Sequence, residues 1–314
     1  MVYENVIDVS YHQGKIDWSK VKASGKVDMA IIRVGFRGYG TGVICPDVRA
    51  AENLAGATAA GIPVGAYFFS TALTEREARE EAAYVINVLQ GYHVKGPVVF
   101  DFEGYTNSDY RTYGKTTQAS RTAMCKVFCD VVKSAGYTSL IYGSKGIIRS
   151  KYDLANLPDY GIWCARYAGG YDKILSDQKY FPDLGEHTPR ITMWQYTSIG
   201  RVPGISGNVD LNYCYKDCHL DAGSEPDTPE DISGEILKSI DKMEVFVDMK
   251  TYRNGSTPEP VYADNAGKEK IGSLNPYETC NCLGIYDGMA AVLYTKDKSK
   301  IEKIGFVKYI NGIQ

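Results

Sequence analysis

The sequence predicts an eight-stranded α/β barrel over roughly the first 220 residues, followed by a small all-β domain. In the first part, short runs of β-branched or apolar residues alternate with longer helical patterns, as they do in βαβ units. An acidic segment at 221–235 then interrupts this alternation. Beyond residue 236 only short strand patterns remain, separated by Gly, Asn and Pro turns.

The strand patterns of the first part are eight in number, at 5–11, 29–35, 63–70, 97–103, 139–144, 161–167, 192–197 and 209–213. Helical patterns separate the early ones, for example from Thr74 to Gln90, where Thr74 can cap the helix and Glu77 holds the capping-box position. After the fifth strand the spacers become short and irregular. Mostly parallel strands with crossover helices favour a closed barrel of the triosephosphate-isomerase type, with short or missing helices after the later strands.

An open, doubly wound sheet is the alternative architecture. Such sheets commonly bind nucleotides through glycine-rich turns, but no G-x-G-x-x-G follows the first strand and no P-loop motif occurs in the chain. The sequence therefore gives no reason to predict a nucleotide cofactor.

The segment at 221–235 holds six acidic residues and two prolines but no Lys or Arg, which is the composition of a solvated linker. We therefore place the barrel at 1–220, the linker at 221–235 and a second domain at 236–314. Strand patterns in the second domain lie at 244–253, 260–265, 278–295 and 303–310. Because it lacks a cluster of His, Ser and acidic residues, we expect this domain to bind a ligand rather than to catalyse a reaction.

Charge and hydropathy exclude several classes of partner. The net charge is −3 and basic residues are scattered, so a nucleic-acid partner is not predicted. No apolar stretch approaches membrane-spanning length, and Met1 to Ser10 lacks the pattern of a signal peptide. We therefore expect no membrane insertion, and synthesis in the cytoplasm without a cleavable signal.

The eight cysteines lack the tight spacing of a disulfide framework and are typical of thiols in a reducing compartment. A zinc site built from Cys214, Cys218, His219 and the pair Cys280 and Cys282 would need C-x₂-C spacing, which neither pair has. Buried structural thiols are the favoured interpretation, and no metal or other cofactor is predicted.

Four acidic residues fall where the strands of a barrel would end. Asp8 lies in the first strand, Asp101 and Glu103 close the fourth, and Asp210 lies in the eighth. Since strand side chains alternate, Asp101 and Glu103 point the same way, and barrel closure brings Asp8 and Asp210 beside them. Mutual repulsion and burial should raise at least one pKa towards neutrality, as a general acid for glycoside hydrolysis requires. Ordinary capping or ion pairing, and Mg²⁺ or Ca²⁺ binding, are the competing interpretations.

Aromatic residues at the same strand ends could line a sugar-binding groove, because their flat faces pack on sugar rings and their polar tips bond hydroxyl groups. Tyr167 and Tyr196 belong to this aromatic set, although core packing explains part of it. Alternation places Trp194 and Tyr196 on one side of their strand and Gln195 on the other. The residues that we predict to bind substrate are Arg33, Tyr67, Phe69, Tyr142, Trp163, Arg166, Trp194 and Gln195.

Over nearly all of 5–216 the chain resembles the glycoside hydrolase family 25 lysozymes, the Chalaropsis type found as phage endolysins and bacterial autolysins. The resemblance rests on DVSYHQGKIDW at 8–18, GAY at 65–67, DFE at 101–103, WCARY at 163–167 and WQYTSIGRVPGISGNVDLN at 194–212. It implies that Glu103 is the catalytic acid, with Asp8, Asp101 and Asp210 as companions. It also implies cleavage of the β-1,4 bond between N-acetylmuramic acid and N-acetylglucosamine in peptidoglycan.

The C-terminal part resembles a bacterial SH3-type wall-binding domain, with VY at 261–262 and GFV at 305–307. Such an enzyme would act on the bacterial wall after release from the host cytoplasm. A non-catalytic carbohydrate-binding barrel would be favoured by loss of a catalytic carboxylate, and a metal-dependent phosphodiesterase by a ligand set containing His. Only His12 lies close to a candidate carboxylate, and we interpret it as a loop residue or a sugar contact.

Overall fold

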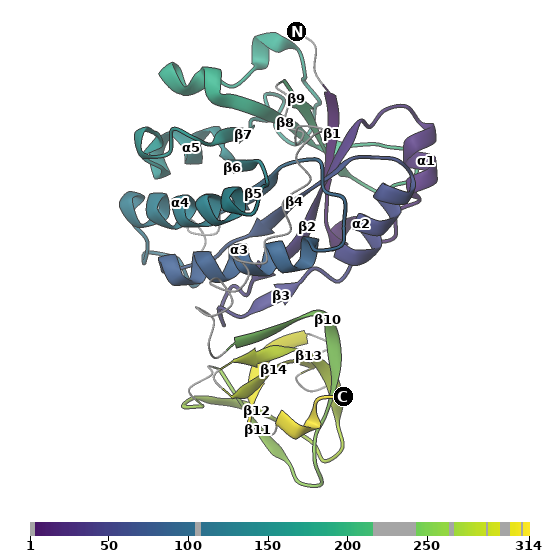
Figure 1. Ribbon diagram of the computed structural model, residues 1–314, viewed down its shortest axis with the longest axis vertical. Helices are drawn as coiled ribbons and strands as arrows, with labels where there is room; N and C mark the ends of the chain where they lie inside the picture. The colour runs from purple at the N-terminus through teal and green to yellow at the C-terminus, as the bar shows by residue number, and fades with distance from the viewer. Residues whose placement is uncertain are drawn as a thin grey trace.

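The computed structural model describes residues 4–103, 108–215, 243–263, 267–286, 288–295, 302–308 and 310–314. Figure 1 shows two bodies: a larger α/β domain that begins at the N-terminus and a small β domain that holds the C-terminus. The predicted linker at 221–235 lies outside the described residues. No helix among these residues has the length and apolar character needed to cross a membrane.

Eight strands form a closed barrel, and all eight strand patterns of the sequence are strands. Hydrogen bonds between β1 and β2 close the sheet. In barrel order the strands are β1 (Glu4–Val9), β2 (Met29–Arg37), β4 (Val64–Phe69), β5 (Val98–Asp101), β6 (Ser139–Ser144), β7 (Gly161–Ala165), β8 (Ile191–Gly200) and β9 (Val209–Cys214). A ninth strand, β3 (Ile44–Pro46), pairs with the end of β2 as a hairpin outside the barrel.

The last barrel strand runs against its neighbours. Strands β1 to β8 of the barrel are parallel, whereas β9 is antiparallel to both β8 and β1. The beginning of β9 therefore lies at the same rim as the carboxyl ends of the other strands. Asp210, the second residue of β9, faces that rim in register with Asp8 of β1.

Helices cover the outside of the early strands, as Figure 1 shows. They are α1 (Trp18–Ala23), α2 (Ala50–Ala59), α3 (Glu75–Leu89), α4 (Gln118–Ser134) and α5 (Lys145–Lys151). Between β7 and β8 the chain makes only 3₁₀ turns, in agreement with the short, irregular spacers of the sequence. Helix α3 begins as predicted, with the Thr74 hydroxyl accepting from the Glu77 N–H at 3.2 Å. The Glu77 carboxylate, however, accepts from the Leu73 N–H and not from Thr74.

Alternation along the strands separates two layers of core. Inside the barrel, Met29, Ile31 and Val99 are fully buried. Outside it, Phe100 and Phe102 are fully buried against the helices, and Phe100 contacts Phe128 of α4 at 5.1 Å between ring centroids. Because Phe100 and Phe102 point outward, the intervening Asp101 points into the barrel.

The second domain is a six-stranded antiparallel sheet in the order β10-β13-β14-β15-β11-β12. Its strands are β10 (Met243–Arg253), β11 (Glu259–Tyr262), β12 (Lys270–Leu274), β13 (Thr279–Tyr286), β14 (Met289–Thr295) and β15 (Glu302–Val307). The sequence analysis did not predict β12. Buried Tyr252, Val261 and Val292 contribute to the core of this second domain.

The two domains share an apolar contact. Val43 and Cys45, in and just before β3, form one buried cluster with Leu283, Met289 and Phe306 of the second domain. Figure 1 shows β3 facing this domain below the barrel. The apolar part of the contact between the domains thus involves β3 and the residue before it.

Candidate active site

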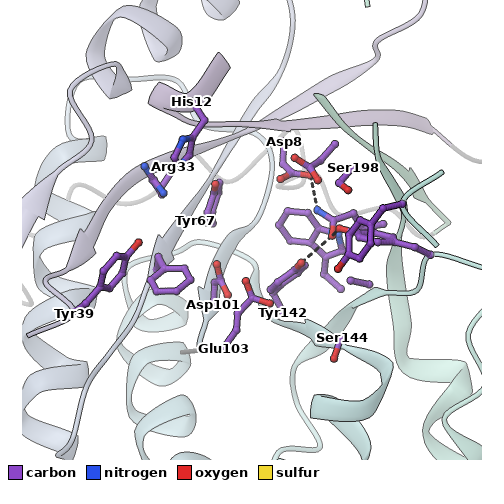
Figure 2. A pocket seen from close by; sticks show the side chains of 17 residues that line it. Asp8, His12, Arg33, Tyr39, Tyr67, Asp101, Glu103, Tyr142, Ser144 and Ser198 are labelled. Atoms are coloured by element: carbon purple, nitrogen blue, oxygen red, sulfur yellow. Dashed lines mark hydrogen bonds between the residues drawn. The ribbon is translucent and has the colours of Figure 1, made fainter. Parts of the chain in front are cut away.

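A pocket of about 500 Å³ opens at the rim where the parallel strands end. Figure 2 shows its lining side chains. They come from most of the barrel strands and the loops that follow them: Asp8, His12, Arg33, Tyr39, Tyr67, Phe69, Asp101, Glu103, Tyr142, Ser144, Trp163, Ala165, Tyr167, Tyr171, Gln195, Ser198 and Asp210.

All four candidate carboxylates line this one pocket. Asp8 and Asp101 are buried, with 7% and 4% of their surface exposed. Glu103 follows two residues after Asp101, and Asp210 lies opposite Asp8 on the neighbouring strand. The structure therefore brings together four residues from three separate segments, as strand alternation and barrel closure predict.

Two side-chain amides hold Asp8 in place. Asn212 Nδ2 and Gln195 Nε2 donate to Asp8 Oδ2 at 2.8 and 3.0 Å. The orientation of each amide is fixed from behind, because Trp163 Nε1 donates to Asn212 Oδ1 while the Tyr142 hydroxyl donates to Gln195 Oε1, both at 2.8 Å. Asp8 thus has a defined position, and the hydrogen bonds that hold it extend to the aromatic wall of the pocket.

The electrostatics of the pocket favour protonated carboxyl groups. Burial raises the pKa of Glu103 to about 7, with a further contribution from the charge of Asp8. Burial and Asp8 together raise the pKa of Asp210 to about 8. Asp8 is raised less, to about 6, because its burial is opposed by the hydrogen bonds from Asn212 and Gln195. The cluster therefore retains protons near neutral pH, as a general acid needs.

Asp101 is the most deeply buried of the four. Burial and the neighbouring Glu103 raise its pKa well above the ordinary value, while Arg33 opposes that shift. Its Oδ1 atom is buried without a hydrogen-bond partner among the described residues. A buried carboxylate oxygen without a donor costs free energy, so this atom is placed to accept a hydrogen bond from a ligand.

Aromatic rings form the walls around the carboxylates. Trp163 contacts Tyr67 and Tyr142 edge to face, with ring centroids 6.4 and 4.8 Å apart. Phe69 contacts Tyr39 in the same way at 5.7 Å. Flat apolar faces with hydroxyl tips beside acids are suited to a pyranose ring.

Sequence reasoning missed Tyr39, Tyr171 and the two serines of the pocket lining. Tyr39 lies in the GYGTG turn after β2, and its ring packs on Tyr110 at 4.6 Å between centroids. A tyrosine between glycines directly after a strand was an available signal. His12, on the 3₁₀ turn after β1, also lines the pocket, and its ring lies 4.1 Å from that of Tyr11.

Two predicted substrate-binding residues lie away from the pocket lining. Arg166 Nη1 donates to the carbonyl of Phe181 at 2.9 Å, and so supports the turn at 178–181. Trp194 is fully buried, and its Nε1 donates to the Arg166 carbonyl at 3.0 Å. Because Gln195 points into the barrel, the alternation of β8 turns Trp194 outward. The structure therefore gives both residues a packing position, while the other six predicted residues line the pocket.

The part of the chain that builds most of this site matches a known protein family. Residues 7–205 match the model of glycosyl hydrolases family 25, which covers more than half of the chain. The chain belongs to this family. Asp8, Asp101 and Glu103 lie within the matched residues, and Asp210 lies just beyond them.

Individual relatives are more distant. Lysozyme M1 of Streptomyces globisporus is 27% identical over 66% of this chain and 66% of its own length. The lysozyme of Streptococcus phage Cp-7 is 27% identical over 61% of this chain and 50% of its own. The structure of the modular autolysin LytC from Streptococcus pneumoniae, solved with a synthetic peptidoglycan ligand, is 25% identical with a TM-score of 0.56, over 68% of this chain and 47% of that one. The chain thus spans two thirds or less of the length of these relatives.

Proposed function

We propose that this protein is an N-acetylmuramidase that hydrolyses the β-1,4 bond between N-acetylmuramic acid and N-acetylglucosamine in bacterial peptidoglycan. The observation that carries the proposal is the cluster of four carboxyl groups in one aromatic pocket, with pKa values raised towards and beyond neutrality. Family membership and the lysozymes among its relatives support the same reaction. Acids with raised pKa values are suited to proton transfer, so catalysis explains the pocket better than binding alone.

In the proposed mechanism Glu103 donates its proton to the oxygen of the leaving sugar. Its raised pKa keeps that proton in place near neutral pH. Asp101 lies on the same strand segment, so the two acids approach the scissile bond from one side. That placement does not suit a base or nucleophile on the opposite face of the sugar. We therefore assign the nucleophile to the carbonyl oxygen of the substrate's own 2-acetamido group, the substrate-assisted exception among glycosidases.

Asp101 then has a defined task. Its unpartnered Oδ1 accepts the N–H of the acetamido group and orients it for attack, and this hydrogen bond stabilises the oxazolinium that forms. Asp8, held by Asn212 and Gln195, keeps this arrangement in place. Glu103, left ionised by the first step, accepts the proton of the water that opens the oxazolinium and is thereby restored, and Asp210, across from Asp8, positions that water.

The reaction can be tested on purified peptidoglycan. Digestion followed by borohydride reduction should yield muramicitol ends. Glucosaminitol ends, or new amino termini without new reducing ends, would contradict the proposal. Nuclear magnetic resonance of the first product should show the β-anomer before mutarotation, because the two-step reaction retains configuration. An α-anomer would instead make Asp210 or Asp8 a base in a single displacement.

We further propose that residues 236–314 form an SH3-like domain that binds the cell wall, and that the protein acts as a lytic enzyme, an endolysin, on walls reached after release from the cytoplasm. The compact antiparallel sheet and the acidic segment before it support a separate binding module. Tethering raises the local concentration of the barrel at its substrate. The full chain carrying Glu103→Gln should therefore sediment with intact walls more strongly than residues 1–223 carrying the same change. Equal sedimentation of the two proteins would contradict the wall-binding role. Equal rates of lysis by protein added outside untreated cells and by protein produced inside them would contradict the release step.

A further inference from the structure

Asn212 of β9 has a hydrogen-bonding environment that admits only one orientation of its side-chain amide. Its Nδ2 donates to Asp8 Oδ2 at 2.8 Å and to the carbonyl of Val6 at 3.2 Å, and its Oδ1 accepts from Trp163 Nε1 at 2.8 Å. A carbonyl oxygen can only accept a hydrogen bond, and an indole N–H can only donate one. Turning the amide over would place oxygen against oxygen at Val6 and N–H against N–H at Trp163. These two neighbours therefore fix which end of Asn212 faces Asp8, whatever the protonation state of Asp8.

The fixed amide restricts the protonation of Asp8. Its Oδ2 also accepts from Gln195 Nε2 at 3.0 Å, a bond drawn as a dashed line in Figure 2, so this oxygen faces two N–H groups. N–H groups that donate to a carboxylate stabilise its ionised form. Gln195 is held less strictly than Asn212, because the Tyr142 and Tyr167 hydroxyls bonded to its Oε1 are groups that can accept as well as donate. The orientation that favours an ionised Asp8 is therefore imposed from the Asn212 side.

No cation in the described part of the chain is paired with Asp8. The ionisable groups that line the pocket around it are Arg33 of β2, Tyr39 after β2, Tyr67 of β4, Asp101 and Glu103 at and after the end of β5, Tyr142 of β6, Tyr167 and Tyr171 after β7, Asp210 of β9 and His12 after β1. Arg33 pairs with Asp47 at 2.8 Å. Burial and Arg33 lower the pKa of His12, which is therefore neutral near neutral pH. The direct support for a charge on Asp8 thus comes from the two amides.

The charge of Asp8 decides where the other protons of the cluster reside. After burial, it is the largest cause of the raised pKa values of Glu103 and Asp210. If Asp8 kept its own proton, this repulsion would vanish and Glu103 would lose its proton at a lower pH. Under the proposed function, on which this inference rests, only the proton on Glu103 reaches the leaving sugar.

We propose that Trp163 and Asn212 are positioning residues that make Asp8 the ionised member of the four acids, and so retain the catalytic proton on Glu103. Trp163 then acts on the reaction through its N–H group rather than through its ring. Its burial agrees with this role, because only 2% of Trp163 is exposed and little of the ring is left for a sugar to contact. Asn212, at 1% exposed, acts through Asp8 as well.

The first measurement is the order in which the acids lose their protons. Carbon-13 labels in the carboxyl groups of aspartate and glutamate give both midpoints in the full chain, with Asp8→Asn and Glu103→Gln identifying the signals. Asp8 should titrate at about 6, below Glu103 at about 7. An Asp8 midpoint equal to or above that of Glu103 would overturn the inference, even if no other variant folds.

Two variants then remove the proposed lock. Asn212→Leu keeps the approximate size of the side chain but has no donor. The midpoint of Asp8 should rise by about one pH unit or more, the effect of losing one hydrogen bond to a charged group. The midpoint of Glu103 should fall, and the alkaline limb of kcat/KM on soluble peptidoglycan fragments should move to lower pH with it. Trp163→Phe keeps an aromatic ring without the N–H, and should cause smaller shifts in the same directions because Val6 still orients the amide.

Trp194→Phe is the matched control. The Trp194 N–H also donates to an oxygen, the backbone carbonyl of Arg166, but on the outer side of the barrel. This variant should lower the midpoint of thermal unfolding while the two titrations and the pH profile stay as in the wild type. Thermal unfolding of Asn212→Leu and Trp163→Phe checks that each is folded.

A lower kcat in Asn212→Leu and Trp163→Phe, with the titration order and the alkaline limb unchanged, would show that both residues act only through packing. That result would overturn the inference. Failure of the proposed function has a different signature. In that case the wild type would produce no muramic reducing ends, whereas the titration order needs no turnover and is measured all the same.

Discussion

Two groups of buried acids in the barrel differ in how their charge is compensated. Between β2 and α3, Arg37 donates to Glu81 at 2.7 Å and to Glu80 at 3.2 Å. Arg111 donates to both oxygens of Glu77 at 2.9 Å. In the pocket, by contrast, Asp101, Glu103 and Asp210 have no ion pair to any described residue. Arg33, which also lines the pocket, pairs through its Nε with Asp47 instead.

The pKa values show the consequence. Burial would raise the pKa of Glu77, but its arginine partners lower it below the ordinary value. Even beside Arg37, burial raises the pKa of Glu81 to about 7. In the pocket burial and repulsion act in the same direction, which raises the pKa of Asp210 to about 8. Arginine partners thus outweigh the cost of burial at Glu77 and offset only part of it at Glu81, whereas the pocket acids are kept at a cost in stability without such partners and are available for chemistry.

The largest expected effect of a substitution is on turnover. Glu103→Gln keeps the shape of the side chain but has no acidic proton, so the rate of peptidoglycan cleavage should fall by at least about 10²–10⁴-fold. Its thermal unfolding should remain close to that of the wild type. The Glu103→Asp variant serves as a control, because it keeps an acidic group on a side chain that is too short to reach the same position. Near wild-type turnover in Glu103→Gln would show that Glu103 is not the catalytic acid.

Substitution in the compensated group should act on stability instead. Arg37→Gln leaves Glu81 buried without its cation and should lower the free energy of unfolding by about 3–5 kcal/mol, measured by urea denaturation. Arg76→Gln is the matched control, because Arg76 pairs with Glu80 from a largely exposed position and should cost about 1 kcal/mol or less. Equal losses in the two variants would contradict the distinction between buried and exposed partners.

The comparison also shows what the sequence could and could not predict. The positions of Asp8, Asp101 and Glu103 could be predicted. Strand alternation is visible in the local sequence, and barrel closure is a general property of this fold. Asp47 and Tyr39 belong to turns whose partners are fixed only by long-range packing, so no periodicity indicated them. Alternation also described Trp194 correctly as opposite to Gln195, but it does not say which side faces the pocket. The antiparallel direction of β9 was hidden for a similar reason, because both strand directions share a two-residue period.

A smaller effect is expected when one uncompensated acid is removed. A folded-state pKa raised above the unfolded value means that stability is lost as pH rises from about 4 towards the folded pKa, here about 8 for Asp210. Asp210→Asn removes this cost and should raise the free energy of unfolding by about 1–3 kcal/mol at pH 8. The gain should nearly vanish at pH 4. Thermal unfolding at the two pH values measures it, and a gain independent of pH would contradict the assignment.

The most direct test of the account is the titration of Glu103 itself. Carbon-13 labelling of glutamate carboxyl groups, with Glu103→Gln identifying the signal by its disappearance, gives the midpoint in the intact protein. The account predicts a midpoint of about 7 and a fall in kcat/KM on the alkaline side of the same pH. A midpoint near the ordinary glutamate value of about 4.3 would show that the pocket does not hold the proton, and would contradict the central claim.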